Sequence, residues 1–334
     1  MSASHDPRPL LAVDGLVKHY ATRRSIWDAI TGARAIRVQA VNGVSLNVGR
    51  GETLGVIGES GCGKSTLGRA ILRLHEPTSG RVTFDGTDVT ALDRDGMLRM
   101  RRRMQIVFQD PYASLNPRKT VLDILGGALR IHGIVRGADV KDRVVATMES
   151  VGLRGSHIGR YPHQFSGGQR QRIGIARALI LKPDFVVCDE PVSALDVSIQ
   201  AQIIQLLGDL KRELGLTYLF ISHDIAVIGY VSDRVAVMYL GEIVEQGPTR
   251  RVLAAPRHPY TQALLSAVPR VDGTDRRGRT ILTGELPSPL APPAGCKFHT
   301  RCPLATGICR TAAPVAVQVG DGHSAACHLL TEAA

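Results

Sequence analysis

A glycine-rich segment between an apolar run and a helical pattern constrains the fold of this chain more than any other feature. The run Thr53–Ile57 is typical of a buried strand, and the pattern from Ser65 to Leu74 predicts a helix that stops before Pro77. Between them lies Gly58-Glu59-Ser60-Gly61-Cys62-Gly63-Lys64-Ser65-Thr66. Such a loop presents backbone N–H groups to an anion at a helix N-terminus, so we predict an α/β fold that binds phosphate there.

The residue types in this loop suit a nucleoside triphosphate. Backbone N–H groups surround the phosphates, the Lys64 side chain reaches the β- and γ-phosphates, and the Ser65 hydroxyl binds Mg²⁺. The predicted nucleotide-binding residues of the loop are Gly58, Ser60, Gly61, Cys62, Gly63, Lys64, Ser65 and Thr66. A simple glycine turn would not require the strand and the helix on either side.

Two carboxylates follow a second apolar run, Phe185–Cys188. Four apolar residues ahead of two acids are expected of a parallel strand that is buried on both faces and delivers acids at its carboxyl end. Asp189 is predicted to hold Mg²⁺ through water, and Glu190 to orient or deprotonate the attacking water. The pair therefore predicts hydrolysis of the nucleotide.

A third motif, Ser166-Gly167-Gly168-Gln169, follows Phe165 and begins a helical pattern. Its glycines allow close backbone approach, and the positive end of the helix can meet a γ-phosphate. The motif resembles the signature of ATP-binding-cassette (ABC) ATPases, with Phe165 in place of the usual leucine. The resemblance implies that the nucleotide is ATP, and that Ser166, Gly167, Gly168 and Gln169 contact ATP held by a second ATPase subunit.

The same resemblance implies the architecture: a P-loop NTPase (RecA-like) α/β core with an antiparallel β subdomain, and a helical subdomain inserted at about residues 111–182. The sequence agrees at several places. Apolar and polar residues alternate over Ala40–Val48, and hairpins are predicted at Arg81–Val89 and Arg234–Gly247. An amphipathic helix is predicted with one apolar face formed by Ile199, Ile203, Leu206, Leu207, Leu210 and Leu214.

Further family positions match one residue at a time. Gln109 resembles the glutamine that touches Mg²⁺, His223 the switch histidine that senses the γ-phosphate, and Tyr20 the aromatic residue that stacks on adenine. Ser193 and Asp196 resemble the loop that contacts the opposite subunit. The resemblance thus implies catalysis by Lys64, Glu190 and His223, and Mg²⁺ binding by Ser65, Gln109 and Asp189. Ala21–Arg37, a basic segment that contains Trp27, follows Tyr20 and has no predicted role.

Composition bounds the class of protein. The chain has 334 residues, which favours about two domains, and we predict them at 1–250 and 251–334. No apolar stretch reaches the roughly 18 residues of a membrane-spanning helix, and the N-terminus lacks an apolar signal core, so a cytoplasmic chain is expected. The net charge of +11 suits ATP, acidic partners or anionic lipids; nucleic acid is not expected, because the basic residues form no long tract.

Four of the six cysteines fall in the proline-rich C-terminal region. They are Cys296, Cys302, Cys309 and Cys327. In a cytosolic chain such clustering favours a metal or a cluster over disulfides, and four thiolates satisfy either Zn²⁺ or an iron–sulfur cluster. Unmetallated thiols are the third possibility. Cys62 and Cys188 are interpreted as packing residues.

The C-terminal region is similar to the extension of ATPase subunits from oligopeptide and dipeptide importers. The resemblance rests on His258-Pro259-Tyr260-Thr261, Gly284-Glu285-Leu286-Pro287-Ser288-Pro289 and Gly295-Cys296-Lys297-Phe298-His299-Thr300-Arg301-Cys302-Pro303. It is greatest to the second, F-type subunit of these importers. Some members of the group carry a [4Fe-4S] cluster, which implies Cys296, Cys302, Cys309 and Cys327 as its ligands.

This resemblance also implies partners and a location. We expect a second, different ABC ATPase subunit, two transmembrane permease subunits and an extracytoplasmic peptide-binding protein, with the chain held at the cytoplasmic face of the membrane. Peptides are the expected solute, and nickel and glutathione are the alternatives within importers. A soluble cassette ATPase that acts on nucleic acid or ribosomes is the rival class; such proteins often have two cassettes or long insertions, which this chain lacks.

Overall fold

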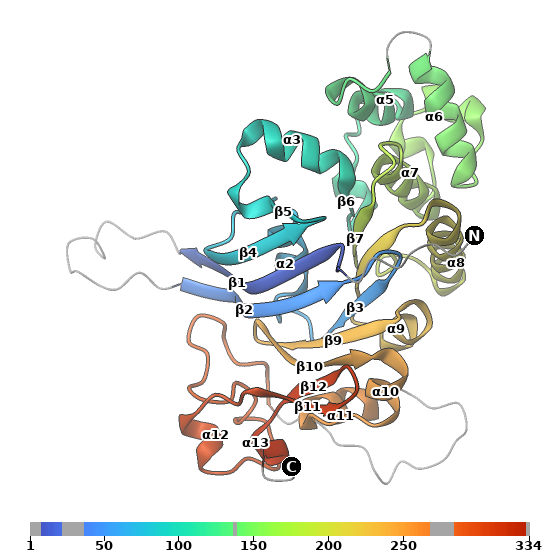
Figure 1. Cartoon of the computed structure of the whole chain (residues 1–334). Coiled ribbons are helices and arrows are strands. Elements are labelled where there is room, and N and C mark those ends of the chain that lie inside the picture. Colours follow the sequence, from blue (N-terminus) through green and yellow to red (C-terminus); the bar gives the residue numbers. More distant parts are fainter. Residues whose placement is uncertain (1–7, 22–36, 136–138, 268–283, 332–334) are drawn as a thin grey trace, which may run out of the picture. The chain divides into compact units, whose positions relative to one another are not determined.

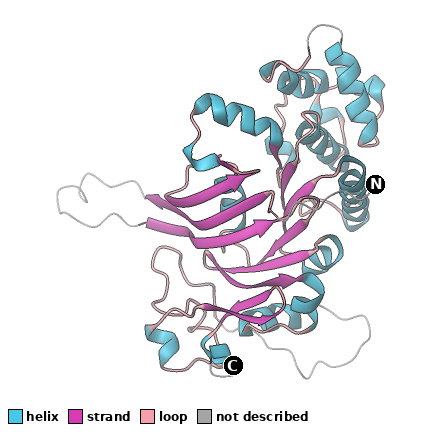
Figure 2. Ribbon diagram, in the orientation of Figure 1, coloured by secondary structure: helices cyan, strands magenta, loops and turns pink. Residues whose placement is uncertain are grey.

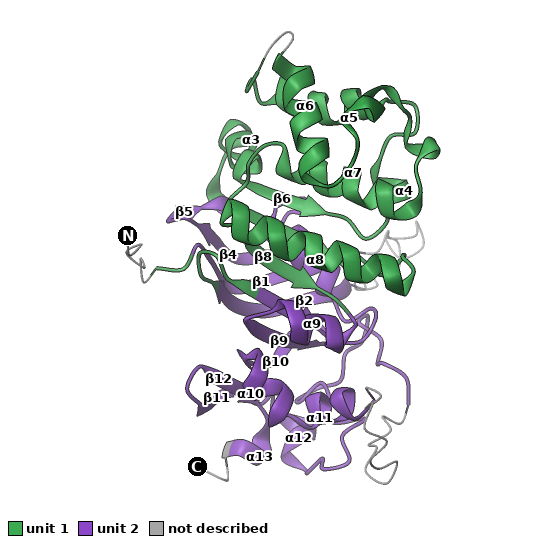
Figure 3. Ribbon diagram, turned by 90° about the vertical axis from the view of Figure 1, so that its right-hand side faces the viewer, with its two compact units in different colours: residues 1–9, 48–53, 91–222 green, residues 10–47, 54–90, 223–334 purple. Residues whose placement is uncertain are grey.

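The computed structural model describes residues 8–21, 37–135, 139–267 and 284–331 (Figure 1). Trp27 and most of its basic segment lie outside the described residues. The chain divides into two compact units (Figure 3). Unit 1 consists of residues 1–9, 48–53 and 91–222, and unit 2 of residues 10–47, 54–90 and 223–334.

Unit 1 is built on three parallel strands in the order β8-β7-β6. They are β6 (Met104–Val107), β7 (Phe185–Asp189) and β8 (Thr217–Ile221). Every residue of β7 and β8 is buried. The predicted strand before the two carboxylates is therefore confirmed, and its burial on both faces explains why it is apolar throughout.

The helices of unit 1 include the region for which the sequence predicted a helical subdomain, where α5, α6 and α7 pack together (Figure 1). Apolar positions spaced three or four apart form their contact faces, as in α5 with Val121, Leu125 and Leu129 buried. The bounds are α3 (Arg94–Arg103), α4 (Pro111–Ser114), α5 (Val121–Ile131), α6 (Asp139–Ser150), α7 (Gly167–Leu179) and α8 (Val197–Leu214).

Helix α8 is amphipathic, as predicted, but its buried face is narrower than expected. Ile203, Leu207 and Leu210 are buried, whereas Leu214 at the C-terminal end is 50% exposed. Gly215 follows with a φ of 64° and ends the helix. The last leucine therefore lies outside the buried part of the helix.

Unit 2 contains a five-stranded arrangement in the order β11-β12-β10-β9-β3 (Figure 2). Strands β3 (Thr53–Ile57) and β9 (Arg234–Tyr239) are parallel, and β10 (Glu242–Pro248), β12 (His323–Ala326) and β11 (Ala316–Gly320) continue antiparallel. Leu240 and Gly241 have φ values of 42° and 83°, which makes the predicted hairpin turn. The C-terminal region thus adds two strands beside β10.

A second sheet of unit 2 has the order β2-β1-β4-β5. Its strands are β1 (Leu11–Ala21), β2 (Arg37–Val48), β4 (Ser79–Phe84) and β5 (Thr87–Asp88). The last residues of β2 alternate between buried and exposed, as the sequence predicted. Asp85 and Gly86 both have positive φ values, so they form the predicted tight turn between β4 and β5.

Short helices complete unit 2: α2 (Lys64–Ile71), α9 (Ile225–Val231), α10 (Thr249–Ala254), α11 (Pro259–Ser266), α12 (Ile308–Thr311) and α13 (His328–Thr331). The sequence predicted that α2 continues to Leu74, but it ends at Ile71 because Arg73 adopts a φ of 48°. Among the described residues, no helix is long and apolar enough to span a bilayer.

Candidate functional site

The glycine-rich loop connects β3 to α2 in unit 2, and two of its glycines are required by the backbone path. Gly58 has a φ of 154° and Gly63 a φ of 109°. A Cβ at Gly58 would lie 2.2 Å from the carbonyl oxygen of Met238, and a Cβ at Gly63 would lie 2.1 Å from that of Ala40. No side chain fits at either position, so the loop keeps its N–H groups close to any bound anion.

Lys64 is the first residue of α2, and the loop itself holds its ammonium group. Nζ donates to the carbonyl oxygens of Gly58 at 2.7 Å and Glu59 at 2.9 Å, and the residue is buried. Because these oxygens belong to neutral peptide groups, they do not cancel the charge of the ammonium. The arrangement therefore places a positive charge inside a loop of phosphate-binding shape.

Two residues of the C-terminal region contact Glu59 of this loop. Arg301 Nη1 donates to both carboxylate oxygens of Glu59, at 3.0 and 3.1 Å, and the backbone N–H of Glu59 donates to the Tyr260 hydroxyl at 2.9 Å. Burial lowers the pKa of Arg301, but hydrogen bonding and charge interaction with Glu59 and Tyr239 together outweigh burial, so that pKa is raised. The sequence gives no signal for these contacts, because they join residues that are 242 and 201 positions apart.

The two other cysteines lie buried in the core. Cys62 is part of the glycine-rich loop, and Cys188 is in β7. Burial raises the pKa of both thiols, so both stay protonated at neutral pH. The oxidation that an exposed Cys62 thiolate would undergo is disfavoured in this environment.

In unit 1, the two predicted carboxylates end β7 and start the following turn. Asp189 is fully buried. Glu190 has a φ of 47°, an uncommon conformation for a residue with a side chain, and its N–H donates to the Ile221 carbonyl of β8 at 3.0 Å. Gln109 Nε2, which follows β6, donates to Glu190 Oε2 at 3.0 Å. The structure thus brings two predicted site residues from two strand ends together.

The loop after Glu190 turns back on itself. The Ser193 hydroxyl donates to the Glu190 carbonyl oxygen at 3.1 Å. Asp196 is the N-cap residue of α8, and its exposed side chain makes no capping hydrogen bond. The structure therefore joins Ser193 to Glu190 and leaves the Asp196 carboxylate at the surface.

The signature motif of unit 1 starts α7 with a capping box. The Ser166 hydroxyl accepts from the Gln169 N–H, and the Gln169 side-chain oxygen accepts from the Ser166 N–H at 3.1 Å. A Cβ at Gly168 would lie 2.6 Å from Cγ2 of Ile199 in α8, so glycine is needed for this helix contact. Ser166 and Gln169 are exposed, whereas Phe165 is buried. The tip of the helix therefore faces away from the core of its unit.

His223 and Tyr20, the two other predicted nucleotide contacts, belong to unit 2. His223 is exposed and follows β8 after Ser222. Tyr20, near the end of β1, makes an edge contact with His75 at 5.7 Å between ring centroids, and the Lys18 ammonium lies 4.7 Å from its ring centroid. Tyr20 therefore contacts His75 and Lys18, and its stacking on adenine stays a prediction.

The four C-terminal cysteines lie within electrostatic reach of one another. The Cys296 N–H donates to the Cys309 carbonyl oxygen at 2.9 Å. Burial, with smaller contributions from the charges of the three other cysteines, raises the pKa of Cys296 to about 11. Among the described residues, however, no group of three or more His, Cys, Asp or Glu side chains is arranged to hold a metal ion.

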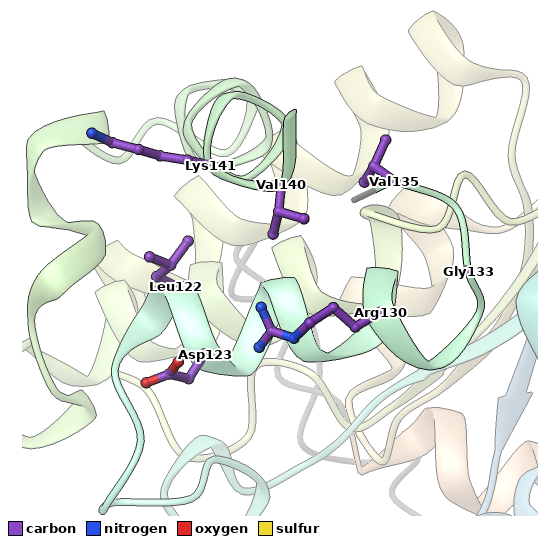
Figure 4. A pocket seen from close by; sticks show the side chains of 7 residues that line it. All are labelled: Leu122, Asp123, Arg130, Gly133, Val135, Val140 and Lys141. Atoms are coloured by element: carbon purple, nitrogen blue, oxygen red, sulfur yellow. The ribbon is translucent and has the colours of Figure 1, made fainter. Parts of the chain in front are cut away.

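A separate pocket of about 480 Å³ lies on the helical region of unit 1 (Figure 4). Leu122 and Val140 give it apolar walls, and Asp123, Arg130 and Lys141 lie around them. The pocket contains none of the predicted nucleotide contacts. Its lining therefore mixes apolar and charged side chains.

Comparison with known families identifies the class of protein. Residues 41–193 match the family described as ABC transporter, which covers the glycine-rich loop, the signature and both carboxylates. An oligopeptide transport ATP-binding protein of Bacillus subtilis, AppF, is 49% identical over 323 residues, which cover 96% of this chain and 97% of that one. The chain therefore belongs to the ABC transporter ATPases, and the predicted resemblance is confirmed.

The C-terminal region specifies the group within this family. Residues 244–309 match the family described as oligopeptide/dipeptide transporter, C-terminal region. A protein of Brucella ovis named as a peptide import ATP-binding protein is 53% identical over 319 residues, 96% of this chain and 97% of its own. The dipeptide transport ATP-binding protein DppF of Haemophilus influenzae is 50% identical over 96% of both chains. The chain is an ABC ATPase with an oligopeptide/dipeptide transporter C-terminal region.

Solved structures confirm the predicted fold class. The cbiO1 protein of Clostridium perfringens, part of the ABC transporter complex cbiONQ, is similar with a TM-score of 0.61 and 29% identity, over 74% of this chain and 91% of that one. A dimeric ATP-binding cassette in a post-hydrolysis state, bound to ADP and Pi, is similar with a TM-score of 0.62 and 30% identity, over 72% and 99%. The α/β fold is that of ABC ATPase cassettes.

Proposed function

We propose that this ATPase energises the import of di- or oligopeptides through a membrane transporter. The observation that carries the proposal is the similarity along 96% of the chain to proteins named for peptide import, together with the match of residues 244–309. The printed names of these relatives and of the C-terminal family refer to peptides, which favours peptides over nickel or glutathione as the solute.

In this proposal the glycine-rich loop binds the phosphates of ATP. Gly58 and Gly63 allow the backbone path of the loop, whose N–H groups would surround the triphosphate. Lys64 would balance the charge on the β- and γ-phosphates. Ser65, Gln109 and Asp189 are the residues that would hold Mg²⁺, and Tyr20 would stack on adenine. When bound, Mg²⁺ supplies charge stabilisation for the transferring phosphoryl group.

Hydrolysis requires a water molecule in line with the γ-phosphate. We assign its orientation to Glu190, whose carboxylate is already fixed by Gln109, and the sensing of the γ-phosphate to His223. The exposed Ser166–Gln169 tip of α7 would contact ATP of a second ATPase subunit, with Ser193 and Asp196 facing that subunit. This arrangement makes association of two subunits part of the catalytic cycle.

We further propose that the chain works at the cytoplasmic face of the membrane with a different second ATPase subunit, two permease subunits and an extracytoplasmic peptide-binding protein. The helical subdomain, residues 111–182, is the proposed permease contact, and its pocket at Leu122 and Val140 supports a docking role. We propose that residues 1–250 form the cassette and residues 251–334 an accessory domain. The accessory domain would remain attached through β10 and β12.

We propose a [4Fe-4S] cluster on the cysteines, with Zn²⁺ as the alternative. The proposal rests on the chemistry of the side chains, because four thiolates satisfy either group; in the described residues these thiols are near one another but not arranged around a metal ion. Cys296, Cys302, Cys309 and Cys327 would hold it, and when bound it would cross-link the extension. Iron, sulfide and zinc analysis after anaerobic purification tests the proposal, with Cys302→Ser as a variant that should lose metal. Protein without iron would rule out the cluster.

The transport proposal is tested with the purified importer. The chain, co-expressed with the permease and ATPase genes that neighbour its own, is reconstituted in vesicles with the binding protein, and uptake of a labelled dipeptide is measured. ATP-dependent uptake is expected for the wild type and none for Lys64→Ala. ATP-dependent uptake of nickel or glutathione without peptide uptake would replace the proposed solute. Hydrolysis stimulated by nucleic acid, without permease association, would replace the proposed class.

A further inference from the structure

The C-terminal extension contacts the phosphate loop of its own unit at one residue, Glu59. Arg301 neutralises the Glu59 carboxylate, and Tyr260 accepts the hydrogen bond of the Glu59 N–H. Glu59 lies between Gly58 and Ser60, and its carbonyl oxygen also accepts from Lys64. One loop residue thus joins the extension to Lys64, the lysine proposed to contact the phosphates.

Tyr260 packs in an aromatic cluster, which we define as Tyr239, Tyr260 and Phe298, and the guanidinium of Arg301 lies 6.0 Å from the Tyr239 ring centroid. The ring centroids lie 4.6 Å apart for Tyr239–Tyr260, 5.3 Å for Tyr239–Phe298 and 5.4 Å for Tyr260–Phe298. All three residues are almost fully buried. Side chains packed in this way have little freedom, so the groups that contact Glu59 are fixed before nucleotide arrives.

The charge of Glu59 gives the contact a consequence for nucleotide binding. A carboxylate in a loop that surrounds a triphosphate repels the phosphates unless a cation compensates it. The Arg301 side chain is 7% exposed and that of Glu59 26% exposed, so water screens this pair less than a surface pair. Arg301 therefore cancels a repulsive charge and at the same time sets the position of the loop.

We propose that Arg301 and Tyr260 are positioning residues of the ATPase, through which the C-terminal extension sets the affinity of the phosphate loop for ATP. The inference rests on the proposed binding of ATP by that loop. It adds that the extension is part of the nucleotide-binding machinery, and that any partner or modification that displaces Arg301 weakens ATP binding.

The test uses the full chain and measures the Kd for ATP by calorimetry, with KM and kcat for hydrolysis. Arg301→Gln is expected to weaken ATP binding about tenfold and to raise KM while kcat changes less than about twofold, because a hydrogen-bonded charge pair is lost. The double variant Glu59→Gln/Arg301→Gln is expected to recover most of the affinity, because the uncompensated carboxylate is gone. A purely structural role of Arg301 would leave the double variant as weak as the single one.

Two further variants separate the possible outcomes. Tyr260→Phe removes only the hydroxyl and is expected to weaken ATP binding about threefold, so it tests the inference should Arg301→Gln fold poorly. Asp321→Asn is the matched control, because Asp321 forms an exposed ion pair with Arg251 at 3.7 Å on the same extension; its Kd should equal that of the wild type.

The results that overturn the inference are wild-type ATP affinity in Arg301→Gln and Tyr260→Phe, or a double variant that recovers nothing. Lys64→Ala distinguishes this failure from failure of the proposed function. Retained ATP binding in Lys64→Ala would refute the assignment of the loop itself. Lost binding in Lys64→Ala, with unchanged affinity in the extension variants, would refute only the role of the extension.

Discussion

Replacing Gly168 by alanine provides a direct test of the signature helix. The added Cβ would lie 2.6 Å from Cγ2 of Ile199, whereas an ordinary contact needs 3.4–4 Å. Ile199 is β-branched and therefore stiff, so the start of α7 must move away from α8 by about 1 Å. That start carries Ser166 and Gln169, the groups proposed to meet the γ-phosphate of a partner.

A displacement of about 1 Å in a positioning group costs about 10²-fold in rate, so Gly168→Ala is expected to lower kcat for ATP hydrolysis by about that factor. Binding of ATP to the variant should not change, because the phosphate loop belongs to the other unit. The assay is phosphate release by the assembled ATPase at saturating ATP. Equilibrium ATP binding is measured on the same preparations.

Two companion variants make the reasoning specific. Ile199→Ala removes the clashing methyl group, so Gly168→Ala/Ile199→Ala should recover at least about tenfold of the lost rate. Gly174→Ala, in the same helix, has no atom within 4 Å of the added Cβ and should hydrolyse ATP like the wild type. Wild-type turnover of Gly168→Ala, or a double variant no faster than the single one, would refute the steric argument.

Three other predictions follow from the site and the core. Glu190→Gln should reduce ATP turnover at least about 10²-fold and leave ATP bound, measured by phosphate release and nucleotide binding; rapid turnover would contradict its role. Phe298→Ala should lower the free energy of unfolding in urea by about 3–5 kcal/mol, while Val315→Ala, at a 75% exposed position, should change it by less than about 0.5 kcal/mol. Burial lowers the pKa of His258 from 6.5 to about 4. Between pH 6.5 and pH 4 the unfolded chain therefore binds a proton on this imidazole that the folded chain does not bind. Stability should therefore fall as pH falls from 6.5 to 4, by up to about 3 kcal/mol, and this part of the loss should be absent in His258→Asn.

Much of the fold could be predicted because its signals are local. The runs Thr53–Ile57 and Phe185–Cys188 are short and apolar, since strands covered on both faces have no polar side, and both form buried strands. The turn at Asp85-Gly86 was predicted because Gly tolerates positive φ. The end of α2 was wrong by three residues, because the conformation of Arg73 is not visible in an apolar pattern.

The candidate site was predictable residue by residue but not contact by contact. Gln109 and Glu190 were singled out separately, and their hydrogen bond depends on β6 and β7 lying side by side. The requirement for glycine at Gly168 depends on the close passage of α8, which begins 29 residues later in the chain. Such contacts depend on packing between elements, and a linear pattern does not encode it.

The sequence by itself determined the order of the motifs, the residue types that bind phosphate and the family to which the chain belongs. These signals are local, because tight loops require glycine and strands buried on both faces require apolar residues. Only the tertiary structure decided which residues support those motifs. Arg301 and Tyr260 reach Glu59 because β9 and the aromatic cluster bring the extension beside the phosphate loop. Contacts between such distant positions form only when the chain has folded, because closing a long loop costs conformational entropy, and packing elsewhere in the fold offsets that cost.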